Sequence, residues 1–361
     1  MYEYKKATAI LITLLLIVLG LSACGGEDDS SSEAETVSTA VSEEDSGSEQ
    51  QDAVHQMIVN KPGMATTALG TGIAKMLSEG TALNMQTREQ PGGAKALAQL
   101  VNSGQGSFTV SQTRYDYDAY IGGLIFEDDR QENLRLIATG PPLAIGMVVK
   151  RDSSYLNVSD VAGARLPAGF SSSQQPLVDL TAFLQMGGLT WDDVQEVSVS
   201  DIGAETQAFM EGRVDVAHLA LQSASAEEAN ASISGGIRFL SIPNDEQLLY
   251  SSPYGQGYWI VEAKKGSAPG VLEDINTLAL RVSLDTNAMV DNEIVYMVTK
   301  AMWENVIDQG DIHPLFKAWN HESFVLANAT LPYHPGAIQF YKEVGVWTDE
   351  MEQKQQELLQ Q

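Results

Sequence analysis

Short apolar runs alternate along the chain with stretches in which apolar residues recur every three or four positions. The first runs, Met57–Asn60, Ala82–Thr87 and Gly106–Gln112, are typical of strands. Helical spacing begins near Leu69 and again near Ala94, between these runs. The pattern therefore predicts a unit with the order strand, helix, strand, helix and strand.

The same order of elements returns about one hundred residues later. Strands are predicted at Ala164–Gly169, Val194–Ser200 and Val214–Gln222, with helices at Pro176–Gly188 and Glu205–Gly212. Proline at the first helical turn and glycine after the last are the expected helix boundaries. Strands that alternate with helices form parallel sheets with right-handed crossovers. We therefore expect an α/β protein with two similar lobes, a hinge and an interlobe cleft.

The candidate ligand-binding residues lie on the polar loops and strand ends of both units, because ligands bind open α/β sheets outside the carboxyl ends of their strands. Hydroxyl groups and helix N-termini there would hold a carboxylate, and the two glutamines would bind neutral polar groups. A simple helix cap is the alternative for the serines. The candidates are Gly63, Met64, Ala65, Thr66, Thr67, Pro91, Gly92, Gly93, Ser111 and Gln112 in the first unit, and Ser171, Ser172, Ser173, Gln174 and Gln222 in the second.

Several apolar runs are candidates for strands that cross between the lobes. The segment Leu134–Lys150 contains two such runs, which Gly140-Pro141-Pro142 separates. Later candidates are Ile237–Ile242, Tyr258–Val261 and Leu278–Val282. We expect the hinge near Leu143–Lys150 and Leu240–Pro243. The predicted division is lobe 1 over 54–150, lobe 2 over 151–242, a return to lobe 1 over 243–333 and a C-terminal helical segment over 334–361.

The N-terminus has the features of a secretion signal. Lys5 and Lys6 precede the apolar run Ala7–Leu21, which is too short for a membrane span. The following Leu-Ser-Ala-Cys sequence resembles the bacterial lipobox, in which the cysteine is lipidated and becomes the first residue of the mature chain. Cys24 is the only cysteine, so an intramolecular disulfide is excluded. We predict a lipoprotein signal peptide over 1–23 and lipidation at Cys24; an ordinary signal peptide is the alternative.

Residues 24–53 form a predicted acidic tether. Ten acidic residues and no lysine or arginine fall between Gly25 and Ala53, a composition typical of disorder. The chain as a whole has a net charge of −27, and residues 54–361 keep 37 acidic and 19 basic residues. This charge argues against a nucleic-acid partner, which requires a basic surface. A small anion stays possible, since a local site can oppose the overall field.

The sequence contains no recognisable catalytic motif. The five histidines do not have metal-ligand spacing, and no nucleophile elbow, phosphate-binding loop or dinucleotide fingerprint occurs. We therefore predict no enzyme activity, no cofactor and no metal ion. Cations that could meet an anionic ligand are Lys61, Arg88, Lys95, Arg114 and Arg165. Aromatic residues that could close over it, or simply pack, are Tyr115, Tyr117, Tyr120, Tyr254, Tyr258 and Trp259.

The C-terminal third carries a family resemblance. VTKAMWEN at 298–305 and LPYHPGAIQFYKE at 331–343 are similar to segments of the TAXI-type solute receptors of TRAP transporters. Ser159–Gly163 and Gly212–Val216 resemble further turns of that family, and the likeness extends over about 57–347. It implies a secreted receptor of the type II periplasmic-binding-protein fold. Such receptors bind a small organic anion between the lobes and deliver it to membrane subunits.

The chain departs from that family in its two loops. The family's first loop is rich in glycine, whereas Pro62–Ala68 has one glycine here, and Gly169–Gln174 lacks the second loop's glycines. Met64 and Phe170 therefore predict a more apolar pocket. Our expectation is a monomeric, extracytoplasmic receptor of a TRAP-type secondary transporter, held at the membrane by its lipid alone, for a carboxylate or an amino-acid-like anion. A receptor that signals to a membrane sensor protein, and a secreted enzyme on the same fold, are the alternatives.

Overall fold

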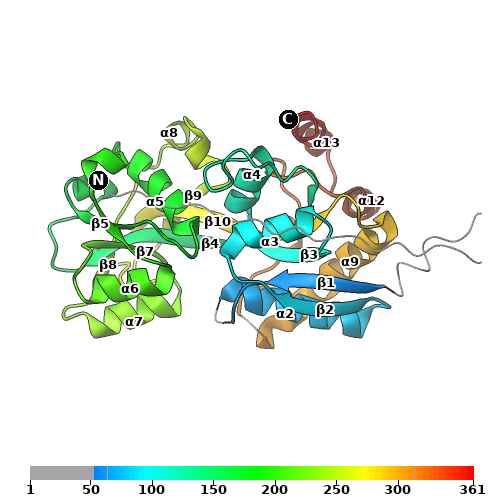
Figure 1. The fold of residues 1–361 in the computed structure, drawn as a ribbon, viewed down its shortest axis with the longest axis horizontal. Helices are drawn as coiled ribbons and strands as arrows, with labels where there is room; N and C mark the ends of the chain where they lie inside the picture. The colour runs from blue at the N-terminus through cyan, green and yellow to red at the C-terminus, as the bar shows by residue number, and fades with distance from the viewer. Residues whose placement is uncertain (1–52, 63, 313) are drawn as a thin grey trace, which may run out of the picture. The chain divides into compact units, whose positions relative to one another are not determined.

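The computed structural model describes residues 53–62, 64–312 and 314–361, which fall within a single unit of the chain (Figure 1). The predicted signal peptide, Cys24, the predicted tether up to residue 52, and Gly63 lie outside the described residues. Among the residues described, no helix has the length and apolar character needed to cross a membrane.

Lobe 1 is built on three parallel strands, β1 (Val54–Val59), β2 (Asn84–Glu89) and β3 (Phe108–Gln112). β1 lies between the other two and pairs in parallel with both. The crossovers are α2 (Ala65–Gly80) and α3 (Gly93–Asn102). The apolar stripe of α2 is buried as its spacing predicted. The carboxyl ends of all three strands therefore point to one edge, where α2 and α3 begin.

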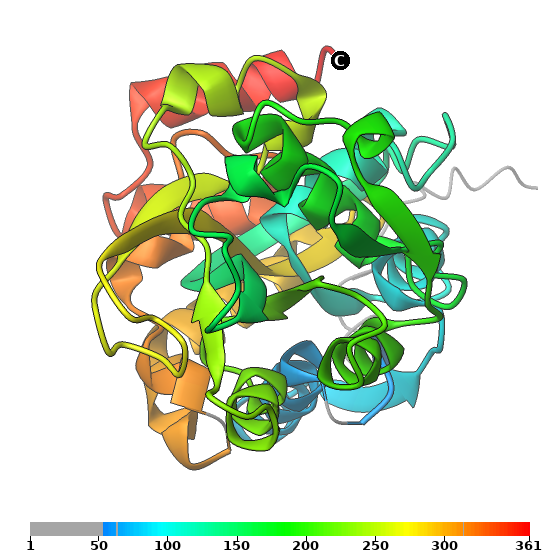
Figure 2. The ribbon, with the colours of Figure 1, turned by 90° about the vertical axis from the view of Figure 1, so that its left-hand side faces the viewer.

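Lobe 2 repeats this arrangement. β5 (Arg165–Ala168) and β6 (Gln195–Ser198) pair in parallel, and β7 (Val216–Ala220) packs beside β5. The helices between them are α5 (Gln175–Met186) and α6 (Ile202–Met210). Figure 2 shows the green elements of this lobe in front of the blue elements of lobe 1. The two units predicted from the sequence are therefore present, and the two-lobed α/β fold is confirmed.

Two long antiparallel strands, β4 (Leu134–Lys150) and β10 (Ile275–Asn287), run through both lobes. The second half of β10 pairs with β3 of lobe 1, and its first half pairs with β9 (Trp259–Ala263). β4 pairs with β7 of lobe 2 through its own second half. The register shifts just after Arg281, which faces Pro142, a residue without an N–H for the ladder. The two long strands therefore pass from one lobe to the other near Pro142 and Arg281.

The structure confirms one of the two segments that were expected to cross between the lobes, and the hinge motion stays a prediction. β4 contains the expected segment Leu143–Lys150, but Leu240–Pro243 does not cross. Leu240 donates its N–H to Met147 and Ile242 donates to Asn276, so this segment lies along the lobe 2 ends of the long strands. The second crossing strand is β10, which contains the candidate run Leu278–Val282.

The remaining elements complete the fold. His334 is the N-cap of α12, and its Nδ1 accepts the N–H of Gly336 at 3.2 Å, so this histidine has a structural role. Burial lowers its pKa to about 4. The elements are α4 (Thr113–Ile121), η1 (Val158–Val161), η2 (Trp191–Asp193), α7 (Ala224–Ser232), β8 (Ile237–Phe239), α8 (Glu246–Leu249), η3 (Pro253–Gly255), α9 (Asn292–Asn305), η4 (Val306–Asp311), α10 (Pro314–Lys317), α11 (His321–Phe324), α12 (Pro335–Glu343) and α13 (Asp349–Leu358).

Candidate functional site

The loops before α3 and α5 meet across the lobes around a cavity of about 220 Å³. Its lining consists of Gly92, Ala94, Lys95 and Ile125 from lobe 1 and Ser171, Ser172, Ser173, Gln174 and Gln175 from lobe 2. Five predicted site residues, Gly92 and the run from Ser171 to Gln174, therefore lie on one cavity. Gly93 adjoins them, because a Cβ added to it would lie 2.9 Å from the Ser173 Oγ.

Both helices present their N-termini at this cavity. Gly92, the N-cap of α3, has a φ of +117°, a conformation that favours glycine and leaves α3 without a capping side chain. Gln174 is the N-cap of α5, and within the described residues its side chain makes no capping hydrogen bond. The first N–H groups of a helix have no intrahelical partner and carry a partial positive charge. Two such ends at one cavity favour an anion.

Gln175 joins the two ends. Its Oε1 accepts the N–H of Ala94 on α3 at 3.3 Å and the hydroxyl of Ser173 at 2.9 Å. The side chain is only 7% exposed although it lines the cavity. Sequence reasoning stopped one residue short of it at Gln174. The polar run that ends just before Pro176 includes Gln175 and was the available signal.

Lys95 supplies the cavity's positive charge. Its Nζ lies 3.7 Å from Glu127, whose side chain is 81% exposed, and its own side chain is 32% exposed. A lysine held so loosely can turn toward a ligand. Two other candidate cations, Arg165 and Arg114, interact with groups outside this cavity. Arg165 pairs with Asp215 at 2.6 Å, and Arg114 is wholly buried.

The residues that line this cavity do not include the other candidates of lobe 1 that the structure describes. Thr67 donates its hydroxyl to the carbonyl of Lys61 at 2.9 Å, which shapes the turn before α2. The Thr66 hydroxyl is buried without a partner among the described residues. Ser111 bonds the carboxyl of Asp116 through its hydroxyl, and Gln112 is the N-cap of α4. Thr67 and Ser111 therefore bond within lobe 1, whereas the Gln112 side chain makes no capping hydrogen bond and Met64, at the start of α2, is partly exposed.

In lobe 2, Gln222 is exposed and donates to the carbonyl of Ser267 at 3.3 Å. Phe170 is fully buried and belongs to the hydrophobic core. The apolar lining residue is Ile125 of lobe 1 instead. Phe170 therefore does not line this cavity, and an apolar pocket formed by Met64 and Phe170 stays a prediction.

A buried polar cluster joins the lobes one turn further along α5. Asp179 accepts hydrogen bonds from the hydroxyls of Tyr115 on α4, at 2.7 Å, and of Tyr258. Its Oδ2 also lies 3.1 Å from Nε2 of His218 on β7. Glu205, on α6, accepts the backbone N–H of His218. We call Asp179 and these four partners the floor cluster.

Burial controls the protonation of the floor cluster. It raises the pKa of Glu205 to about 7, although the nearby His218 opposes the shift. Burial lowers the pKa of His218, but the Asp179 carboxylate and then Glu205 outweigh this effect, so the net shift is upward. Burial and the Asp179 charge keep both tyrosines neutral by raising their pKa.

Arg114 secures the same interface from lobe 1. It pairs with Asp118 at 2.7 Å and donates at 3.0 Å to the carbonyls of Pro253 and Gln256. Gly257 lies so close that a Cβ there would come within 2.7 Å of the Arg114 Cα. This arginine therefore joins α4 to the segment around η3, which packs against α5, and the candidate role as a ligand cation does not fit its bonds.

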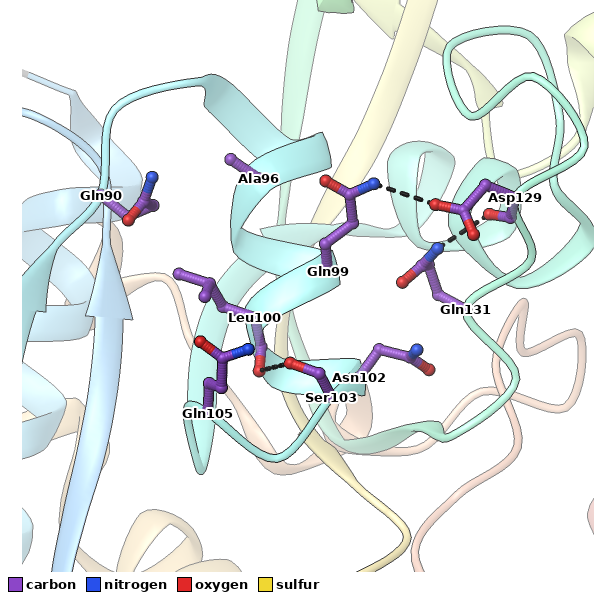
Figure 3. Close-up of a pocket in the computed structure, with 9 residues that line it drawn as sticks. All are labelled: Gln90, Ala96, Gln99, Leu100, Asn102, Ser103, Gln105, Asp129 and Gln131. Atoms are coloured by element: carbon purple, nitrogen blue, oxygen red, sulfur yellow. Dashed lines mark hydrogen bonds between the residues drawn. The ribbon is translucent and has the colours of Figure 1, made fainter. Parts of the chain in front are cut away.

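A larger hollow, of about 440 Å³, follows the exposed side of α3 (Figure 3). Its polar side chains bond within lobe 1: Gln99 donates to the Asp129 carboxylate at 2.9 Å, and Ser103 donates to Leu100 at 3.1 Å. The described residues hold no group of three or more metal-ligating side chains, here or at the interlobe cavity. The cavity between α3 and α5 is therefore the better candidate site.

Comparison with known proteins places the chain in a family. Residues 65–345 match the NMT1-like family. The structure is similar to PhnD1 from Prochlorococcus marinus (MIT 9301) in complex with methylphosphonate, with 11% identity, 81% of this chain and 99% of that chain covered, and a TM-score of 0.50. The alkanesulfonate-binding protein SsuA from Xanthomonas axonopodis pv. citri, bound to MOPS, matches with 14% identity over 84% of this chain and 83% of that chain, at a TM-score of 0.44. The chain therefore belongs to the NMT1-like family and has the two-lobed fold of type II periplasmic binding proteins.

Proposed function

We propose that the protein is an extracytoplasmic solute receptor that binds a small organic anion in the cavity between α3 and α5. One observation carries this proposal: two helix N-termini from different lobes, together with Lys95, meet at the same 220 Å³ cavity. Backbone N–H groups, serine hydroxyls and an ammonium group are all donors, which an anion can accept from simultaneously. A ligand held by both lobes stabilises their closed arrangement.

The surface charge makes this local arrangement necessary. Residues 54–361 carry a net charge of −18, so the overall field repels anions. Helix ends and Lys95 act over a few ångströms, where they oppose that field. The cavity is small, and Ile125 gives it one apolar wall. We infer a small carboxylate or a similar monoanion with a short apolar part.

The cellular role that we propose follows the resemblance to TAXI-type receptors. The receptor would pass its ligand to the membrane subunits of a TRAP-type transporter while a lipid on Cys24 holds it at the membrane. Cys24→Ser should then release the protein from the membrane fraction, because acyl chains supply the anchor. A mutant that still sediments with membranes contradicts the anchor. Signalling to a membrane sensor is the second role; co-purification of a sensor kinase in place of a multi-span transporter subunit would favour it.

A thermal-shift screen of small organic acids tests the binding function, since a ligand of the native state raises the melting temperature. For any hit, calorimetry should show Ser172→Ala and Ser173→Ala weakening binding about five- to a hundredfold, the loss expected for a buried hydrogen bond. Ser103→Ala, in the hollow on α3, is the matched control and should bind like the parent. If Ser172→Ala and Ser173→Ala bind the ligand as tightly as Ser103→Ala, the proposed site is wrong.

Thr66→Ala, Gln112→Ala and Gln222→Ala extend the test to the predicted residues that lie outside the cavity lining. Their positions in the structure predict a smaller loss than for the two serines, because none of the three lines this cavity and Gln222 bonds Ser267. If these three variants lose as much affinity as the serine variants, the ligand reaches beyond this cavity.

A further inference from the structure

The first helical turn of α3 is capped from the opposite lobe. Gly92 has no side chain to offer, and the N–H of Ala94 is instead bonded to Oε1 of Gln175 at 3.3 Å. The same oxygen accepts the Ser173 hydroxyl at 2.9 Å. An amide oxygen from lobe 2 therefore occupies the position that an anion's oxygen would take at this helix end.

We propose that Gln175 is an internal competitor of the ligand: its amide closes the empty receptor, and a bound anion must displace it. The competition rests on the proposed function, whereas the closing role stands on the bond between the lobes alone. A neutral amide oxygen can be displaced from a helix N-terminus by a charged ligand oxygen, because the charged oxygen makes the stronger hydrogen bond there.

The close approach of the lobes at Gly93 supports the closing role. A Cβ at this position would come within 2.8 Å of Oε1 of Gln175 and 2.9 Å of Oγ of Ser173. Gly93 also has a φ of +68°, which side chains rarely adopt. Any larger residue would strain the turn and push the two loops apart.

The closing role is tested without ligand, by distance measurements between spin labels on the full chain. Labels at Gln105→Cys in lobe 1 and Glu228→Cys in lobe 2 use exposed positions, and Cys24→Ser removes the native thiol. Gln175→Ala should lengthen and broaden the interlobe distance. Gln99→Ala also removes a bonded glutamine, but its bond to Asp129 stays within lobe 1, so it should leave the distance unchanged. An unchanged distance in Gln175→Ala overturns the closing role.

Glycine variants provide a second, independent arm. Gly93→Ala and Gly188→Ala carry almost the same strain, because their φ angles are +68° and +69°. Only the first meets the other lobe, since nothing lies within 4 Å of a Cβ at Gly188. The proposal expects a longer interlobe distance for Gly93→Ala alone. Equal distances in the two variants contradict it, and comparison of their melting temperatures separates backbone strain from lobe separation.

The competition is tested by calorimetry with three probes: acetate, methylphosphonate and methanesulfonate. Removal of a neutral competing hydrogen bond in Gln175→Ala should tighten binding roughly two- to tenfold. Gln175→Glu should weaken it, because its carboxylate binds the helix end more strongly and repels the anion. Weaker binding in Gln175→Ala would mean that the amide contacts the ligand, which overturns the competition. If no variant binds any probe, both the competition and the proposed anion site fail, and the label distances alone decide the closing role.

Discussion

The lobes meet twice along one face of α5, and the two contacts differ in kind. The first contact, which we call the mouth, is the hydrogen bond of Gln175 to Ala94 of lobe 1 beside the cavity, and both partners are neutral. One helical turn further, Asp179 holds the hydroxyls of Tyr115 and Tyr258 and faces His218, with all four side chains buried. Positions four apart share a helix face, so one helix serves both contacts. We propose that the weak contact is exchanged for a ligand, while the floor cluster still joins the lobes one turn further along α5.

The floor should be far more sensitive to mutation than the mouth, and Asp179→Ala is expected to give the largest effect. The change leaves His218 and two buried tyrosine hydroxyls without their common acceptor. Breaking a buried ionic contact typically lowers the free energy of unfolding by about 3–5 kcal/mol. Urea unfolding measures this loss. Asp192→Ala, at an exposed acid in the same lobe, is the control. A loss below about 1 kcal/mol for Asp179→Ala would remove the distinction between floor and mouth.

Glu205 should make the stability of the floor depend on pH. Its pKa is about 7 in the folded protein, against 4.5 for the ordinary side chain, so the folded state binds the proton more tightly. The resulting stabilisation is complete below pH 4.5 and is lost as the pH rises through 7. The loss is on the order of 3 kcal/mol. The raised pKa of His218 acts in the same direction, because its ion pair with Asp179 is lost when it deprotonates.

Glu205→Gln tests this dependence, because a neutral amide cannot titrate and keeps an oxygen for the N–H of His218. Urea midpoints from pH 5 to 8 should fall less steeply in this variant, and at pH 8 it should be more stable than the parent. The remaining dependence of the urea midpoint on pH in this variant comes from His218. Glu227→Gln, at an exposed acid on α7, should follow the parent. Identical slopes in Glu205→Gln and the parent would show that Glu205 carries no such proton.

The sequence predicted the fold well because its repeat is local. Each strand and helix of the two units has its own period and its own terminating loop, and the loops before α3 and α5 follow from that order. The second crossing strand was harder to identify. Three apolar runs were candidates, and the expectation chose the segment Leu240–Pro243. Only the pairing of Leu278–Asn287 with β4 and of Val282–Thr286 with β3 distinguishes β10 from the others.

The floor cluster could not be predicted from local pattern. Its lobe 1 part lies on α4, whose sequence TRYDYDAYI has no apolar stripe and is buried through polar contacts instead. Asp179 was visible as an acid inside the apolar run between Val178 and Leu180, a position that requires a partner. The partners come from α4, α6, β7 and the segment before β9, and no spacing in the sequence connects them.

Tyr115→Phe gives an intermediate effect that isolates one bond between the lobes. The variant keeps the ring and removes a single hydroxyl that donates to Asp179. A buried hydrogen bond to a charged group contributes about 1.5–3 kcal/mol, so urea unfolding should show a loss in that range. Tyr254→Phe is the control, since this tyrosine lies near the same interface but outside the floor cluster. Equal losses in both variants would contradict the special position of Tyr115.

Lys95→Ala should have the smallest effect on stability. It therefore tests whether residues at the mouth act on ligand binding and the floor cluster on stability. Its ion pair with Glu127 spans 3.7 Å at the surface, and such pairs contribute below about 1 kcal/mol. Lys75→Ala is a matched control, because Lys75 pairs with Glu79 at 3.9 Å on the outside of lobe 1. Urea unfolding should not separate the two variants from the parent.

Calorimetry with a bound organic acid should separate them, since loss of a charged hydrogen bond weakens binding roughly ten- to a hundredfold in Lys95→Ala alone. That affinity should also fall as salt is added, because salt screens a partly exposed charge. If Lys95→Ala lowers stability as Asp179→Ala does, or binds like Lys75→Ala, then the mouth is a structural contact and the ligand lies elsewhere.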